Sequence, residues 1–199
     1  MFSVRDFLSV VAQLLQKDGV NFVEYGEMLE QRLGCPVALQ TVEWAILDEF
    51  LDEQIPRASE IILQHDLPLG EPSSICAKMY GEWGTSGVIH KIRKTQVYTR
   101  AMRIHLLPLP LVYLTLDDTI ETTATFNCEQ KTLSPIPQIY FIGLMRNLIS
   151  YPVGHTNRRR IARDLLSFIT FYIFHERYRG IEEEDTETEE EFQKRVEKQ

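Results

Sequence analysis

Motifs that mark metal sites, nucleotide sites and hydrolase active sites are missing from this 199-residue sequence. The five histidines are scattered, and no HExxH, CxxC or CxxH spacing occurs. The glycine-rich stretch 81–87 does not form a GxGxxG loop, and no GxSxG nucleophile elbow is present. We therefore expect no metal, no cofactor and no catalytic residue, and predict that the protein is not an enzyme. One alternative stays open, a pairing of Cys76 with His90 or His105, because catalytic partners need only be close in space.

Long apolar runs are missing as well. The longest nearly apolar stretch, Leu165 to Phe174, has about half the length that a helix needs to cross a membrane. Near the N-terminus, Arg5 and Asp6 interrupt the apolar run that a signal peptide would need. The three cysteines are widely spaced, which is typical of reduced thiols. These patterns predict an intracellular protein without a membrane span, in the cytoplasm, the nucleus or both.

The charge of this acidic chain is unevenly distributed. The formal net charge is −8, and residues 181–199 hold nine acidic and three basic side chains, a net charge of −6. Residues 1–180 therefore carry only −2. Dense like charge and few apolar residues leave the last segment too little surface to bury. We predict a single globular domain over 1–180, followed by a disordered acidic tail over 181–199.

The first part of the predicted domain, residues 1–64, has the apolar spacing of helices. Three stretches show this spacing: 2–19, 21–34 and 42–53. In the first stretch, Ser3 and Asp6 are arranged as a helix cap. A helical N-terminal region is therefore expected.

The remainder of the predicted domain divides into a loop connector, 65–88, and a part with both helices and strands, 89–180. Residues 65–88 contain two prolines, four glycines and a serine pair, which predicts a loop. Within 89–180, alternating apolar residues on both sides of Asp117 and Asp118 predict a small β-hairpin. Helices are expected over 136–150 and 158–180. The predicted fold class is α+β and predominantly α: an N-terminal helical region, a central loop with a small β-hairpin, a long C-terminal helix and the disordered tail.

Two clusters of basic side chains stand out in the nearly neutral domain. The candidate residues for docking a partner or RNA are Lys91, Arg93, Lys94, Arg100 and Arg103 in the first cluster, and Arg158, Arg159, Arg160 and Arg163 in the second. Apolar residues are interleaved with the first cluster, so one side of that stretch is expected in the core and the basic side at the surface. The second cluster opens a predicted helix, where the helix dipole disfavours cations. An acidic protein partner, RNA phosphates and a purely structural role all remain open.

The connector and the basic segment after it resemble part of a known protein family. The stretch LPLGEPS, Leu67 to Ser73, is followed by the basic segment IRKTQVYTRAMR, Ile92 to Arg103. Together they resemble the central part of the small nonstructural proteins of phleboviruses, in which a Pro-Leu-Gly-x-Pro loop precedes a basic segment. The corresponding loop residues are Pro68, Leu69, Gly70 and Pro72, whereas Leu67 stands where the family usually has tryptophan. The resemblance covers about residues 47–103, and the length is similar to that of tenuivirus nonstructural proteins.

This resemblance implies a non-enzymatic viral accessory protein. Such a protein binds host proteins in the cytoplasm or nucleus and suppresses antiviral defence, either interferon induction or RNA silencing. RNA is the second candidate ligand. The alternative, which does not depend on the resemblance, is a cellular adaptor or a non-catalytic subunit of a protein complex.

Overall fold

A mixed sheet of six strands forms the centre of the computed structural model, which describes residues 3–47, 53–72, 86–92 and 102–174. The strands are β1 (Phe22–Tyr25), β2 (Thr41–Ile46), β3 (Val88–Lys91), β4 (Arg103–Pro108), β5 (Thr119–Thr123) and β6 (Lys131–Pro135). Their order across the sheet is β3-β4-β2-β1-β6-β5. β2 is parallel to β4 and β1 is parallel to β6, whereas the pairs β1–β2, β3–β4 and β5–β6 are antiparallel.

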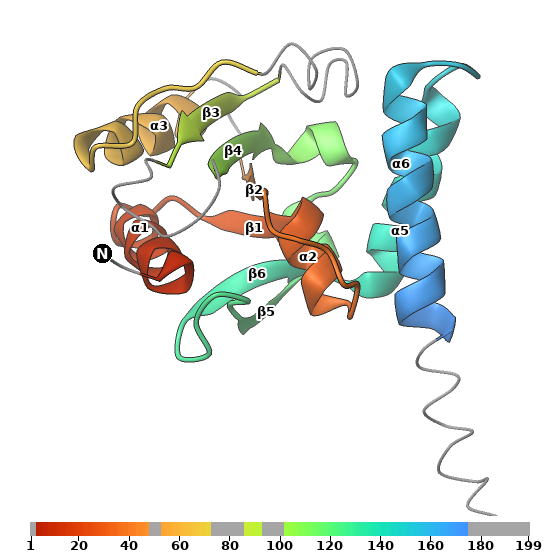
Figure 1. Cartoon of the computed structure of the whole chain (residues 1–199), viewed down its shortest axis with the longest axis horizontal. Coiled ribbons are helices and arrows are strands. Elements are labelled where there is room, and N and C mark those ends of the chain that lie inside the picture. The colour runs from red at the N-terminus through yellow and green to blue at the C-terminus, as the bar shows by residue number, and fades with distance from the viewer. Residues whose placement is uncertain (1–2, 48–52, 73–85, 93–101, 175–199) are drawn as a thin grey trace, which may run out of the picture.

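Helices cover the sheet on both sides (Figure 1). The α-helices described are α1 (Val4–Lys17), α2 (Gly26–Arg32), α3 (Gln54–Gln64), α5 (Pro137–Ser150) and α6 (Thr156–Ser167). α6 continues into a π-helical segment, Phe168–Phe174, and two short 3₁₀ turns, Leu109–Val112 and Leu116–Asp118, lie between β4 and β5. Figure 1 shows α1 and α3 on one side and α5 and α6 on the other.

Two hydrophobic cores lie on opposite faces of this sheet. In the first, Leu8 of α1 and Ile62 of α3 pack with Trp44 of β2. In the second, Leu144 of α5 packs with the neighbouring strand residue, Ala45. Successive residues of β2 thus enter different cores, because side chains alternate across a strand. The strand is buried on both faces.

The predicted predominantly α fold is wrong, and the burial of β2 on both faces explains the error. The stretch predicted as a helix over 42–53 begins with β2, and residues 48–52 lie outside the described part of the chain. A strand that is buried on both faces has a nearly continuous apolar run instead of alternation. Such a run also contains the i, i+3 and i+4 spacings of a helix, so the pattern is ambiguous.

The predicted hairpin is wrong in its first arm. The stretch 109–118 contains the two 3₁₀ turns, and Asp118 closes a capping box with Thr115 in place of a hairpin turn. The second arm does form a strand, β5, but its partner is the later strand β6, which the sequence patterns missed. Likewise, the stretch 21–34 holds β1 as well as α2.

Other predicted elements match the described structure. Helix α1 has the predicted cap, since the Asp6 N–H donates to Ser3 Oγ at 3.1 Å. The helix expected over 136–150 is α5. The acidic segment 181–199 lies outside the described residues. No helix within the described residues is long and apolar enough to span a membrane.

We expect Trp44 to contribute more to stability than any exposed apolar residue of α1. Its fully buried ring stacks on Phe22, with 4.5 Å between the ring centroids. Trp44→Ala should lower the free energy of unfolding by about 3–5 kcal/mol, because a cavity replaces the ring. Urea denaturation followed by circular dichroism measures this. Val10→Ala, on the exposed side of α1, is the control, and an equal loss in both variants would contradict the core position of Trp44.

Candidate functional site

The first basic cluster is described in part. Lys91 and Arg103 lie opposite each other in the β3–β4 register, with Lys91 exposed and Arg103 half-buried. Arg93, Lys94 and Arg100 lie outside the described residues. The structure therefore places the two ends of this cluster side by side on the sheet.

The loop residues of the family resemblance lie next to Lys91. Leu69 forms an antiparallel bridge with His90. The Gly70 N–H donates to the carbonyl of Ile89 at 2.7 Å, and the Lys91 N–H donates to the carbonyl of Pro68 at 2.9 Å. The segment around Leu69 thus pairs with β3 as a short additional strand. Pro72 ends the described part of this loop.

The second basic cluster is largely engaged in contacts within the chain. Arg158 Nη1 donates to the carbonyls of Leu148 and Tyr151 at 2.7 and 2.8 Å, which satisfies the C-terminal end of α5. Arg163 pairs with the adjacent Asp164 carboxylate at 2.7 Å. Arg159 is exposed. The fourth arginine, Arg160, is the centre of a buried ionic group.

Arg160 binds the carboxylate of Glu43 through its Nη2, at 2.7 Å to Oε1 and 2.6 Å to Oε2. Its Nε lies 3.6 Å from Asp164 Oδ2, one helical turn further along α6. The three side chains are nearly inaccessible to solvent, with exposed fractions of 9% for Arg160, 4% for Glu43 and 5% for Asp164. This ion pair joins the central strand β2 to α6.

Local backbone geometry makes room for the Glu43 carboxylate. Gly26 opens α2 with a φ of +58°, and a β-carbon at this position would collide with the Glu43 side chain. Any other residue would therefore be strained in its backbone and would clash. A glycine directly after β1 is what lets the carboxylate lie between β2 and α2.

Electrostatics keeps Glu43 and Arg160 charged. Burial raises the pKa of the Glu43 carboxyl, but the charge and hydrogen bonds of Arg160 outweigh burial and hold this pKa below its usual value. Burial likewise lowers the pKa of Arg160, and the charges of Glu43 and Asp164 raise it more strongly. Burial also lowers the pKa of His105. Its imidazole is therefore neutral at pH 7, and the 3.9 Å separation from Glu43 is not an ion pair.

A protonated carboxylic acid completes the group. Glu30 of α2 is buried, and burial together with the charge of Asp164 raises the pKa of Glu30 to about 8. Glu30 is therefore a neutral hydrogen-bond donor to Asp164 at neutral pH. Such a carboxyl group can exchange protons near neutrality, but the group is buried between α2, α6 and the sheet. Its clearest role is to hold α6 in place.

A serine and a histidine form a second buried polar pair. Ser59 Oγ lies 3.0 Å from His90 Nε2, and His90 Nδ1 lies 3.0 Å from the carbonyl of Leu67. A carbonyl only accepts, so Nδ1 carries the proton and Nε2 accepts from the serine hydroxyl. Burial lowers the pKa of His90. Because both side chains are buried, this pair connects α3 to β3 and the loop and is not accessible to a substrate. Cys76, the thiol considered as a partner of His90, lies outside the described residues.

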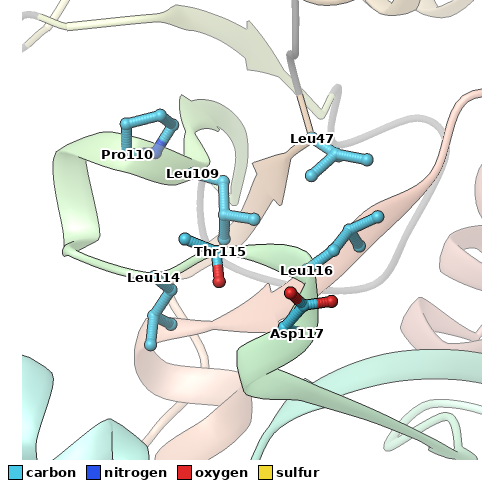
Figure 2. A pocket seen from close by; sticks show the side chains of 7 residues that line it. All are labelled: Leu47, Leu109, Pro110, Leu114, Thr115, Leu116 and Asp117. Carbon is cyan, nitrogen blue, oxygen red and sulfur yellow. The ribbon is translucent and has the colours of Figure 1, made fainter.

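Two hollows open near the 3₁₀ turn Leu116–Asp118. The first, about 330 Å³, is mainly apolar; its lining residues are Leu47, Leu109, Pro110, Leu114, Thr115, Leu116 and Asp117. Figure 2 shows the Asp117 carboxylate next to Leu116 in this hollow. The second hollow, about 480 Å³, shares Leu116 and Asp117 and is more polar; it extends over β5 and β6 to Glu121, Lys131 and Leu133.

An exposed apolar face runs along α5. Ile142, Met145 and Ile149 recur at helical spacing and have exposed fractions of 45%, 37% and 74%. Val153, just after the helix, is 89% exposed. Arg146 is an exposed cation on the same helix. We name Ile142, Met145 and Ile149 the α5 face.

Sequence patterns did not identify Glu43, Glu30 or the Ser59–His90 pair. Only Arg160 of the buried ionic group was a candidate. One signal was present, the i, i+4 spacing of Arg160 and Asp164, which predicts a pair on one helix face. A second signal was Glu43, an acidic residue inside the apolar run 42–46, because a buried charge requires a partner of opposite charge.

A scan against protein-family models, a search of curated proteins and a search of solved structures find no match to this chain. Within the described residues, no group of three or more His, Cys, Asp or Glu side chains is arranged to hold a metal ion.

Removal of Arg160 should destabilise the protein strongly. Arg160→Met leaves Glu43 charged and buried without its partner, which costs about 3–5 kcal/mol of unfolding free energy. Arg159→Met, an exposed neighbour, should change it by less than about 0.5 kcal/mol. The double variant Arg160→Met/Glu43→Leu removes both charges and should recover part of the loss. Urea denaturation of the four proteins gives the comparison, and a double variant no more stable than Arg160→Met would contradict a direct pair.

The elevated pKa of Glu30 predicts a pH dependence of stability. Between the unfolded pKa of about 4.5 and the folded pKa of about 8, only the folded state holds this proton, so the contribution of Glu30 to stability falls as pH rises. Glu30→Gln keeps a neutral donor to Asp164 and removes this dependence. Its stability relative to wild type should therefore increase from about pH 5 to about pH 8. Glu129→Gln, at an exposed site, is the control, and equal pH profiles for wild type and Glu30→Gln would contradict the prediction.

Proposed function

We propose that this chain is a viral nonstructural accessory protein, which binds host proteins in the host cytoplasm or nucleus and thereby suppresses antiviral defence. The observation that carries the binding role is the α5 face. The viral identity and the defence role rest on the resemblance over about residues 47–103.

The α5 face has the character of a protein-binding surface. Single exposed apolar residues are common on protein surfaces, but a row along one helix is the arrangement that a partner covers. Three large side chains at i, i+3 and i+7 spacing lie on one side of the helix, and the most exposed, Ile149, is 74% accessible. The exposed cation Arg146 favours a partner with acidic side chains beside its apolar contact.

The contacts of the second basic cluster favour a protein partner over RNA. Three of its four arginines, Arg158, Arg160 and Arg163, bind carbonyl or carboxylate oxygens of the chain itself. A cation already paired with a carboxylate contributes little to phosphate binding, because that pair would have to be broken. Arg159 alone would provide weak, strongly salt-dependent attraction.

The loop of the resemblance lies beside the strand that leads into its basic segment. The stretch around Gly70 pairs with β3, whose last residue, Lys91, directly precedes the segment Ile92 to Arg103. A β-carbon on Gly70 would lie 3.0 Å from Cγ of Lys91, so the loop backbone passes directly beside this side chain. The Pro-Leu-Gly-x-Pro loop and the exposed Lys91 thus share one surface at the β3 edge. That surface is a second candidate for host-protein contact.

Reporter assays in cells test the proposal. The full chain should repress an interferon-promoter reporter in mammalian cells or reverse hairpin-induced silencing in plant leaves. The double variant Met145→Glu/Ile149→Glu should lose most of this effect, because two charges on the α5 face oppose burial against a partner. The matched control is Leu63→Glu on α3, where the wild-type side chain is 41% exposed.

Each outcome separates two parts of the proposal. Absence of an effect in both reporter systems would contradict the defence role. Full activity of the double variant, at equal expression and equal thermal stability, would contradict the α5 face as the binding surface. Binding of a short duplex RNA that weakens steeply with salt would contradict protein capture as the principal mode.

A further inference from the structure

We infer that the free edge of β5 binds an extended basic segment of a partner protein as an added strand. This site is distinct from the α5 face, so the inference goes beyond the proposed function and does not depend on it.

The two edge strands of the sheet, β3 and β5, differ in whether another segment pairs with them. Figure 1 shows β3 and β5 at opposite ends of the sheet. The β3 edge is paired with the chain's own loop, through the Leu69–His90 bridge and two backbone hydrogen bonds. Within the described residues, no segment pairs with the outer edge of β5. An open edge offers backbone groups to an incoming strand.

The β5–β6 register identifies which backbone groups point outward. The Ile136 N–H donates to the carbonyl of Asp118 at 2.9 Å, and the Ala124 N–H donates to the carbonyl of Gln130 at 2.8 Å. Directions alternate along a strand, so the even-numbered residues of β5 bond β6 and the odd-numbered residues face away from it. The outward groups therefore belong to Thr119, Glu121 and Thr123.

Two of these outward groups are already bonded. The Thr119 N–H donates to the carbonyl of Leu116, and the Thr123 carbonyl accepts from Arg32 Nη2 at 2.6 Å. The described residues provide no partner for the Glu121 N–H, the Glu121 carbonyl, the Thr119 carbonyl or the Thr123 N–H. These four groups have the spacing that an added strand requires. Arg32 marks the end of the available edge.

Side chains along β5 suit pairing. The strand reads Thr-Ile-Glu-Thr-Thr and contains neither proline nor lysine, the residues that commonly protect edges. Its β-branched residues favour extended backbone. Ile120 is 47% exposed and offers apolar contact to a strand laid alongside.

The acidic side chains near this edge favour a basic partner segment. Glu121 lies at the centre of β5, and Asp117 lines the same hollow, against a single lysine there, Lys131. A lysine or arginine opposite Glu121 would form a favourable cross-strand pair. A second copy of this chain, paired antiparallel in the register centred on Glu121, would instead place two Glu121 side chains opposite each other. Like charges directly opposite are unfavourable, which favours a basic partner segment over this symmetric self-pair.

A fluorescein-labelled peptide of alternating lysine and valine tests this site on the full chain. Anisotropy titration at low salt should show saturable binding. N-methylation of alternate peptide amides preserves charge but blocks backbone pairing, and should weaken binding by about tenfold or more. This comparison also controls for simple attraction between a basic peptide and an acidic chain.

Protein variants locate the site. Thr123→Pro removes one outward N–H and leaves the β6 ladder intact, whereas Thr123→Val keeps that N–H. Thr123→Pro and Glu121→Lys should each weaken binding by about tenfold, and Thr123→Val should not. Glu129→Lys makes the same charge change at an exposed position outside β5 and should retain binding. Thermal melts verify that every variant is folded.

Amide hydrogen exchange provides the decisive readout. Peptide binding should slow exchange at Glu121 and Thr123, the two outward amides, while the inward amides of β5 change little. Equal affinity for the methylated and unmethylated peptides, or no slowing at these two amides, would overturn strand addition. A concentration-dependent dimer that Thr123→Pro abolishes would overturn the partner segment in favour of a second copy. Because none of these measurements uses a defence reporter, their failure is distinguishable from failure of the proposed function.

Discussion

A buried arginine must be neutralised where it lies, and the position of α6 depends on that requirement. Arg160 reaches the sheet only because Glu43 stands on the central strand β2 and accepts two short hydrogen bonds from it. Taking both charges out of water is costly, and the gain from their attraction requires this close geometry. α6 is therefore held at one position against the sheet. α5 packs against α6, so the orientation of the α5 face follows from the same pair.

The surrounding groups are consistent with this constraint. Gly26 removes the side chain that would collide with Glu43, and Glu30 stays protonated so that Asp164 receives a donor in place of a second negative charge. A buried polar group is stabilising only when its members are satisfied together. The set joins α2, β2 and α6, which are distant in sequence. It behaves as one structural unit that fixes the position of α6 against the sheet.

The surface of the protein is asymmetric in a way that suits a binding protein. One sheet edge is closed by the chain's own Leu69 segment, and the other presents Glu121 and its backbone groups. One helix, α5, exposes large apolar side chains away from the sheet. Extended segments and apolar helical faces are recognised by different physical means, backbone hydrogen bonding in one case and hydrophobic burial in the other. The two proposed sites, the α5 face and the β5 edge, would therefore act independently.

Local sequence alone determined the elements whose signals are local. The Ser3 cap of α1, the apolar spacing of α1 and Pro137 at the start of α5 act within a few residues, so these helices were predictable. Charge counting located two basic clusters and the excess of acid in 181–199. Tertiary structure decided which partners these helices and charged residues contact. Ala45 and Ile46 have the spacing of one helix face, but the sheet places them in different cores. Arg160 has the pattern of a surface cation, but β2 places Glu43 against it. Pairing between strands and between buried charges joins residues far apart in the chain, and no local pattern encodes the partner.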